Sequence, residues 1–155
     1  MFLMMSLAAM IALGQDSADA IAWRETSSGA EYLLALGEAG ADHVDILMRC
    51  ARTRRSAVRL NVDGLYTGEG PEPRRMSIAS GRARAIVALH YDDRPGGAYA
   101  ASLALGNAAL RAFARTGRLV LSAGNVEIDG NARTEADRNA ISGFFARCRA
   151  VPSGR

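Results

Sequence analysis

The stretch VDILMRCARTRRSAVRLNV, residues 44–62, predicts the centre of the fold. Its first part places Ile46, Met48 and Cys50 on one side of an extended chain, because alternate residues of a strand point to opposite faces. Its last part, AVRLNV, alternates in the same way. The polar run ARTRRS between them is typical of a connecting turn. We therefore expect a β-hairpin whose first strand turns Cys50 toward the core.

The predicted turn carries Arg52, Arg54 and Arg55, and three interpretations of this cluster stay open. The arginines could be solvated turn residues, since charge at a turn remains in contact with water. They could instead form a contact surface for an anionic partner. Nucleic acid is the third possibility, but no aromatic residue is interleaved to stack on bases, and we expect none to bind. All nineteen basic residues of the chain are arginine, which also fits a GC-rich coding sequence.

Residues 1–20, MFLMMSLAAMIALGQDSADA, resemble a signal peptide. The apolar run from Phe2 to Leu13 is too short to span a bilayer. Ala18 and Ala20 provide the small residues of a cleavage site, so we expect cleavage after Ala20. The alternative is a buried first helix. Cleavage would place the protein in the periplasm or outside the cell, with at most peripheral membrane association.

The C-terminal stretch TEADRNAISGFFARCR predicts a helix with one buried face. Thr134 and Asp137 have the spacing of a capping box. Ile141, Phe144 and Cys148 recur at the helical period, together with a second phenylalanine. A shorter helix is predicted before it in NAALRAFARTG, which begins after an asparagine cap and ends at a glycine.

Cys50 and Cys148 are the only cysteines, and in an exported chain such a pair predicts one disulfide. Both are expected to face the same core, one from the hairpin and one from the last helix. Two buried free thiols are the alternative.

The rest of the chain consists mainly of predicted strands separated by Gly- and Pro-rich turns. One of them, RARAIVALHY, is expected to place Val87, Leu89 and Tyr91 on a single face. The sequence thus predicts one α+β domain over residues 21–150, a mainly antiparallel, sandwich-like sheet with two late helices, followed by a flexible tail at 151–155.

A resemblance to known proteins rests on Trp23, on the strand DILMRC and on the closing pattern LRAFARTGRLVLSAG…ADRNAISGFFARCR. Together they resemble small exported alphaproteobacterial proteins of unknown function. The arrangement is also similar to the invasion-associated locus B family of periplasmic proteins, in which a helix, a Gly-x-Leu-x-Val strand and a last helix close a sandwich-like sheet. The first resemblance implies location and fold, and the second implies an envelope or secreted accessory protein.

No nucleophile elbow, zinc-protease motif or nucleotide-binding loop occurs in the chain, so no cofactor is expected. The two histidines each lie near carboxylates, His43 between Asp42 and Asp45 and His90 beside Asp92. Such groups could bind a divalent metal or act in a hydrolase, but the ends of strands give the same pattern without either. The sequence therefore favours a non-enzymatic envelope binding or accessory protein of unknown partner. The alternative is a small hydrolase or metal-dependent enzyme that uses His43 or His90.

Overall fold

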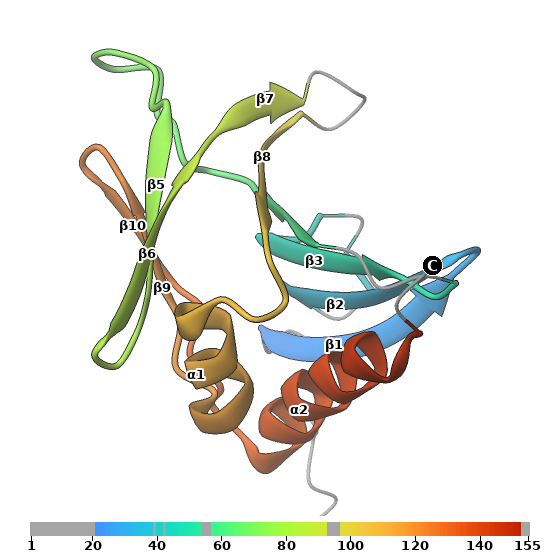
Figure 1. Cartoon of the computed structure of the whole chain (residues 1–155). Coiled ribbons are helices and arrows are strands. Elements are labelled where there is room, and N and C mark those ends of the chain that lie inside the picture. The colour runs from blue at the N-terminus through green and yellow to red at the C-terminus, as the bar shows by residue number, and fades with distance from the viewer. Residues whose placement is uncertain (1–20, 39, 42, 54–56, 93–96, 153–155) are drawn as a thin grey trace, which may run out of the picture.

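The hairpin predicted from residues 44–62 lies at the centre of the larger of two sheets (Figure 1). The computed structural model describes residues 21–38, 40–41, 43–53, 57–92 and 97–152. Within these residues every strand pairing is antiparallel, so the sequence-based prediction of a mainly antiparallel α+β domain is confirmed.

The first sheet has six strands in the order β1-β2-β3-β4-β8-β7. Its strands are β1 (Ala22–Ser28), β2 (Glu31–Gly37), β3 (Ile46–Ala51), β4 (Val58–Val62), β7 (His90–Asp92) and β8 (Ala98–Leu103). The register pairs Ile46 with Val62 and Met48 with Leu60, so the apolar sides of the two hairpin strands coincide. Cys50 is buried on the same side, as the alternation predicted.

The second sheet has four strands in the order β10-β9-β5-β6. Its strands are β5 (Arg75–Ser80), β6 (Ala83–Ala88), β9 (Val120–Ala123) and β10 (Val126–Asp129). β6 and β7 follow one another with Leu89 between them, yet they lie at the edges of different sheets. The expected common face of Val87, Leu89 and Tyr91 is therefore not formed, since Val87 and Tyr91 belong to different sheets. Leu89 is buried, whereas Tyr91 is 57% exposed.

Helix α1 (Ala108–Thr116) has the predicted ends. The Asn107 side chain accepts a hydrogen bond from the backbone N–H of Ala109 at 2.9 Å. Gly117 ends the helix with a φ of 68°, and its N–H donates to the carbonyl of Phe113. A left-handed conformation of this kind favours glycine because it has no Cβ. α1 packs against β5, β6 and α2.

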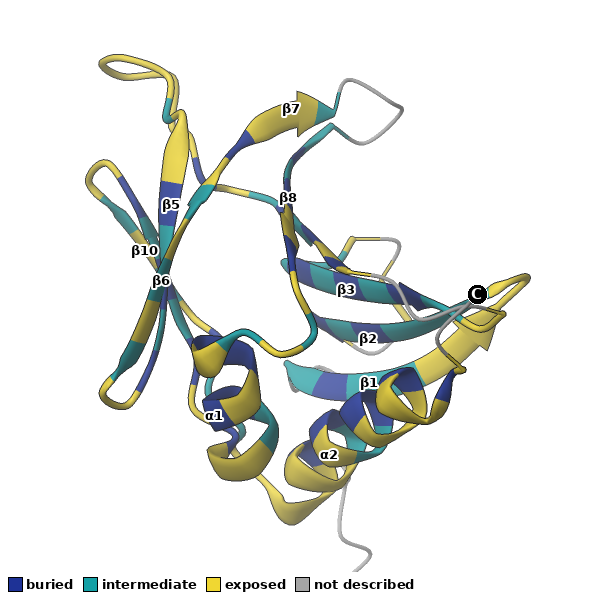
Figure 2. Ribbon diagram, in the orientation of Figure 1, coloured by how far each residue is buried: buried dark blue, intermediate teal, exposed yellow. Residues whose placement is uncertain are grey.

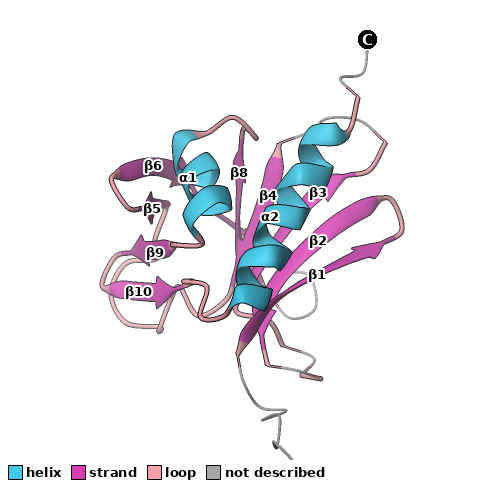
Figure 3. Cartoon of the chain, turned by 90° about the horizontal axis from the view of Figure 1, so that it is seen from below, coloured by secondary structure: helices cyan, strands magenta, loops and turns pink. Residues whose placement is uncertain are grey.

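Helix α2 (Glu135–Ala150) lies along β1 and β2 of the larger sheet (Figure 3). The predicted capping box between Thr134 and Asp137 is present. The predicted helical face is buried in full, and it consists of Ile141, Phe144, Phe145 and Cys148. Neither described helix is long and apolar enough to cross a membrane.

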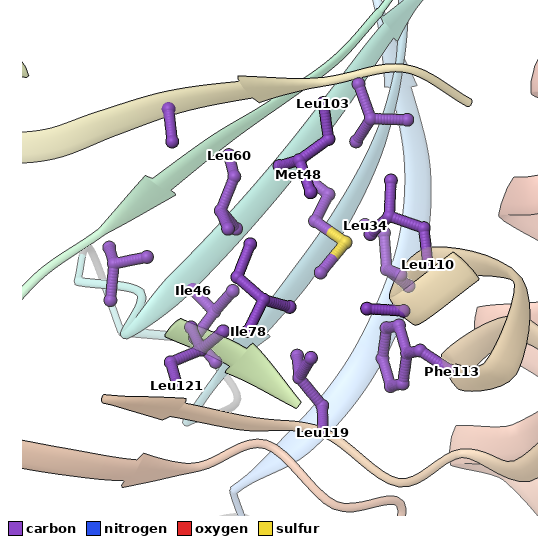
Figure 4. Packing of buried hydrophobic residues seen from close by; sticks show 14 of the residues in the cluster. Leu34, Ile46, Met48, Leu60, Ile78, Leu103, Leu110, Phe113, Leu119 and Leu121 are labelled. Atoms are coloured by element: carbon purple, nitrogen blue, oxygen red, sulfur yellow. The ribbon is translucent and has the colours of Figure 1, made fainter. Parts of the chain in front are cut away.

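The two sheets and both helices enclose one hydrophobic core (Figures 2 and 4). Ile46 and Met48 of the first sheet face Ile78 and Leu121 of the second across this core. Aromatic contacts join the larger sheet to the helices. The ring centroids of Trp23 on β1 and Phe113 on α1 are 5.3 Å apart. A disulfide joins Cys50 to Cys148, with their Cα atoms 6.0 Å apart. The predicted link between the hairpin and the last helix is therefore confirmed.

Candidate functional site

An open pocket of about 410 Å³ lies where β7 and β8 meet the segment that follows β4. We call it the tyrosine pocket, because three of the four tyrosines of the chain line it. Its lining residues are Asp63, Gly64, Tyr66, Glu72, Tyr91, Gly97, Ala98 and Tyr99. A volume of this size is within the range of small-molecule binding sites in proteins.

Two of the tyrosines form a cross-strand pair. Tyr91 of β7 is opposite Tyr99 of β8, and their ring centroids are 5.4 Å apart in an edge-to-face arrangement. Gly97 makes room for this pair, since a Cβ at position 97 would collide with the Tyr91 hydroxyl. Tyr99 is only 7% exposed, whereas Tyr91 is 57% exposed, so the pair has one buried and one accessible ring.

The buried hydroxyl of the pair is held by a carboxylate. Tyr99 donates a hydrogen bond to Glu72 Oε1 at 3.0 Å. Burial and the neighbouring Glu72 raise the pKa of Tyr99 to about 12, so its phenol is neutral at physiological pH. The third tyrosine, Tyr66, donates to the carbonyl of Gly70 at 2.9 Å. The hydroxyls of Tyr66 and Tyr99 thus both donate to acceptors in the segment that follows β4.

We expect alkaline pH to destabilise the protein through Tyr99. Because the folded state holds this proton more tightly than the unfolded chain, the stabilisation is complete below about pH 10 and is lost as the pH rises through about 12. The loss should be roughly 2–3 kcal/mol. Denaturant titrations across this pH range should show that the free energy of unfolding falls more steeply with pH for wild type than for Tyr99→Phe. Parallel declines would contradict the assignment.

The predicted carboxylate cluster around His43 adjoins the tyrosine pocket but does not line it. His43 Nε2 is 3.1 Å from Asp63 Oδ2 and 3.5 Å from Asp45 Oδ1. The His43 side chain is 63% exposed. Asp42, also part of the predicted cluster, lies outside the described residues. In the described part of the chain, no group of three or more His, Cys, Asp or Glu side chains is arranged to hold a metal ion.

The second histidine, His90, lies on β7 and is exposed. It precedes Tyr91, and neighbouring residues of a strand point to opposite faces. His90 is accordingly absent from the lining of the tyrosine pocket.

Of the predicted arginine cluster, Arg52 is described, whereas Arg54 and Arg55 lie outside the described residues. Arg52 donates to the carbonyl of Gly29 at 3.1 Å. Its guanidinium lies over the ring of Tyr32, 5.4 Å from the centroid. Arg147 of α2 lies 5.8 Å from the same centroid. Arg52 is therefore tied to the β1–β2 turn, and a surface for an anionic partner at this cluster stays a prediction.

A second pair of arginines lies on the opposite side of the hairpin from the core. Arg49 of β3 and Arg59 of β4 are directly opposite in the register. Arg49 donates to Asn61 Oδ1 at 2.8 Å and lies 3.8 Å from Glu31, but its Nε is buried without an acceptor among the described residues. The Arg59 side chain makes no ion pair or hydrogen bond within the described part of the chain. Both side chains line a pocket of about 300 Å³.

Replacing Arg59 should stabilise the protein, because like charges directly opposite on neighbouring strands repel each other. We expect Arg59→Thr to raise the free energy of unfolding by about 0.2–1 kcal/mol in denaturant titrations at low salt. Arg49→Thr is the matched control, and it should destabilise because it removes the hydrogen bond to Asn61. Equal losses in both variants would show that repulsion between the two arginines is negligible.

The tyrosine pocket was missed by the sequence-based reasoning, although a signal exists. Tyr91 and Tyr99 flank the turn sequence DDRPGGA, and a hairpin of that length makes them cross-strand neighbours. The contribution of Tyr66 and Glu72 has no comparable signal, because their loop is brought to the hairpin only by the tertiary fold.

Comparison with models of known families, with curated proteins and with solved structures finds no match. The tyrosine pocket and its surroundings are therefore the basis for any statement about function.

Proposed function

We propose that this protein is an exported, non-enzymatic binding protein that holds its ligand in the tyrosine pocket. The observation that carries the proposal is the lining itself, in which tyrosine side chains with fixed hydroxyls are combined with two carboxylates. Pockets with aromatic walls and a few placed polar groups are typical of ligand-binding sites.

Catalysis is less well supported than binding. The described residues that line the pocket include no histidine, serine or cysteine. His43 approaches from outside, and its exposed fraction of 63% differs from the sheltered position of most catalytic bases. The contact between His43 and Asp63 is nevertheless the observation that favours the enzyme alternative.

Export is supported by the signal-like residues 1–20 and by the disulfide, since disulfides persist mainly outside the reducing cytosol. We expect the protein isolated from its native host to begin at Ile21. N-terminal sequencing of the exported fraction tests this. Protein that begins at Met1 and fractionates with cytosolic markers would contradict the proposal.

The binding role can be tested with a metabolite extract of the host. Wild-type protein should retain a compound in equilibrium dialysis, identified by mass spectrometry, that the Tyr91→Ala variant does not retain. Equal retention by both proteins, or none, would contradict a role for the tyrosine pocket. A compound that is converted instead of retained, with conversion lost in His43→Ala, would favour the enzyme.

A further inference from the structure

We propose that the ligand of the tyrosine pocket is an organic cation, a molecule with an ammonium or guanidinium group. This inference rests on the proposed binding function and names the class of its ligand. It follows from the charge of the pocket, from the state of its aromatic rings and from its size.

The charge of the pocket is opposite to that of the whole chain. The protein has a formal net charge of +3, and every basic residue is an arginine. Among the described residues, the lining nevertheless contains Asp63 and Glu72 and no basic residue. These two carboxylates favour a positive ligand and repel an anion. Glu72 is the freer of the two, because Asp63 accepts the backbone N–H of Gly64 and lies 3.1 Å from His43.

The described residues place no cation over the aromatic rings of the pocket. The fourth tyrosine of the chain, Tyr32, lies under the guanidinium groups of Arg52 and Arg147. Within the described residues no arginine occupies the corresponding position over Tyr66, Tyr91 or Tyr99. Because the face of a tyrosine ring attracts cations, this fold already uses cation–π contacts at Tyr32, and the exposed rings of Tyr66 and Tyr91 offer the same contact to a ligand.

The hydrogen bonds inside the pocket also favour a cation. Tyr99 directs its proton toward Glu72, and Tyr66 directs its proton toward Gly70. Neither hydroxyl proton is therefore free to bind an anionic ligand. Glu72 uses one oxygen in this contact, so its charge remains available to a ligand at the pocket wall.

The size of the pocket distinguishes an organic cation from a bare metal ion. A volume of about 410 Å³ is large for a single ion, and two carboxylates do not provide the six or more oxygen ligands that calcium takes. A cationic group with an organic body would occupy both the carboxylates and the aromatic walls.

The decisive measurement compares choline with its uncharged isostere 3,3-dimethylbutan-1-ol by isothermal titration calorimetry. Choline should bind roughly tenfold more tightly, since the two molecules differ mainly in charge. Agmatine serves as the guanidinium probe in parallel. Asp63→Asn combined with Glu72→Gln should reduce the affinity for both cations to that for the alcohol. Glu72→Gln retains an acceptor for Tyr99 and so leaves the pocket wall in place.

Two substitutions of one tyrosine separate the ring face from the hydroxyl. Tyr91→Ala should weaken binding of the cation about tenfold, whereas Tyr91→Phe should keep it within about threefold, because the aromatic face remains. Ile86→Ala is the matched control, since Ile86 is also an exposed apolar residue, at 68%, and lies on β6 outside the pocket. It should leave binding unchanged.

Phosphatidylcholine vesicles distinguish a free ligand from a lipid headgroup. Binding of free choline without co-sedimentation indicates a small molecule, and co-sedimentation that is lost in the Asp63→Asn, Glu72→Gln variant indicates a headgroup. If the alcohol binds as tightly as choline, the cation inference is wrong while the binding function stands. If neither cation binds in any of these forms, the inference is wrong, and the metabolite dialysis decides the binding function separately.

Discussion

Replacing Cys148 with serine should lower the free energy of unfolding by about 2–5 kcal/mol. The disulfide connects β3 to α2 across a sequence separation of 98 residues. In the chain-entropy description, closing a loop of that length reduces the conformational entropy of the unfolded chain and so raises its free energy by roughly 4–5 kcal/mol. Both cysteines are buried members of the hydrophobic core. Guanidinium denaturation under non-reducing conditions measures the loss.

The matched comparisons are Cys50→Ser and wild type treated with a reductant. All three should unfold at similar denaturant concentrations, because each removes the same crosslink. Limited proteolysis should cut α2 first in these proteins, since α2 is the element that the bond ties to the sheet. If Cys148→Ser unfolds within about 1 kcal/mol of wild type, the crosslink does not contribute as the loop-length argument requires.

Local features of this fold could be predicted because their signals lie within a few residues. The alternation in residues 44–62 requires only the two-residue period of a strand, and it placed Cys50 correctly. The ends of α1 follow from Asn107 and Gly117, whose side-chain chemistry acts on adjacent backbone groups. The facing of Cys148 follows from the helical period of its neighbours.

Long-range features could not be predicted from such signals. Leu89 marks a change of sheet, and the sequence on either side of it alternates as one continuous strand would. The opposition of Arg49 and Arg59 depends on the register of the hairpin, which a slip of one residue would change. The tyrosine pocket needs Glu72 to reach β8, and no local pattern specifies that contact.

Trp23 shows the same limit at the first strand. Its indole N–H donates to the carbonyl of Gly130 at 2.9 Å, and its backbone N–H donates to Asp137 Oδ1 at 2.9 Å. Both partners lie more than a hundred residues along the chain. The capping box correctly assigned Asp137 to the start of α2, but the second role of its carboxylate, as an acceptor for β1, depends on tertiary structure.

That second role makes Asp137→Ala the other substitution with a large expected effect. Asp137 is 2% exposed and accepts backbone N–H groups from Trp23, Arg133 and Thr134 at 2.8–3.0 Å. Alanine would leave these donors without their acceptor and remove one half of the capping box of α2, in which Thr134 is the N-cap. Each unsatisfied buried donor costs about 1–3 kcal/mol, and lost caps cost about 0.5–2 kcal/mol. Allowing for relaxation and water, we expect a loss of about 3–5 kcal/mol in denaturant titrations.

The pH dependence of this loss identifies the charge as its source. Burial would raise the pKa of Asp137, but the backbone N–H groups of Arg133, Trp23 and Thr134 and the Thr134 side chain outweigh it and lower the pKa. The carboxylate therefore stabilises the fold fully above about pH 4 and progressively less as the pH falls toward the lowered folded-state pKa. The difference in stability between wild type and Asp137→Asn, which keeps one acceptor oxygen, should narrow over that range. Asp129→Ala is the control, because Asp129 is exposed and accepts only the backbone N–H of Asn131 among the described residues. A difference that stays constant with pH would show that the geometry of the Asp137 side chain, and not its charge, connects β1 to α2.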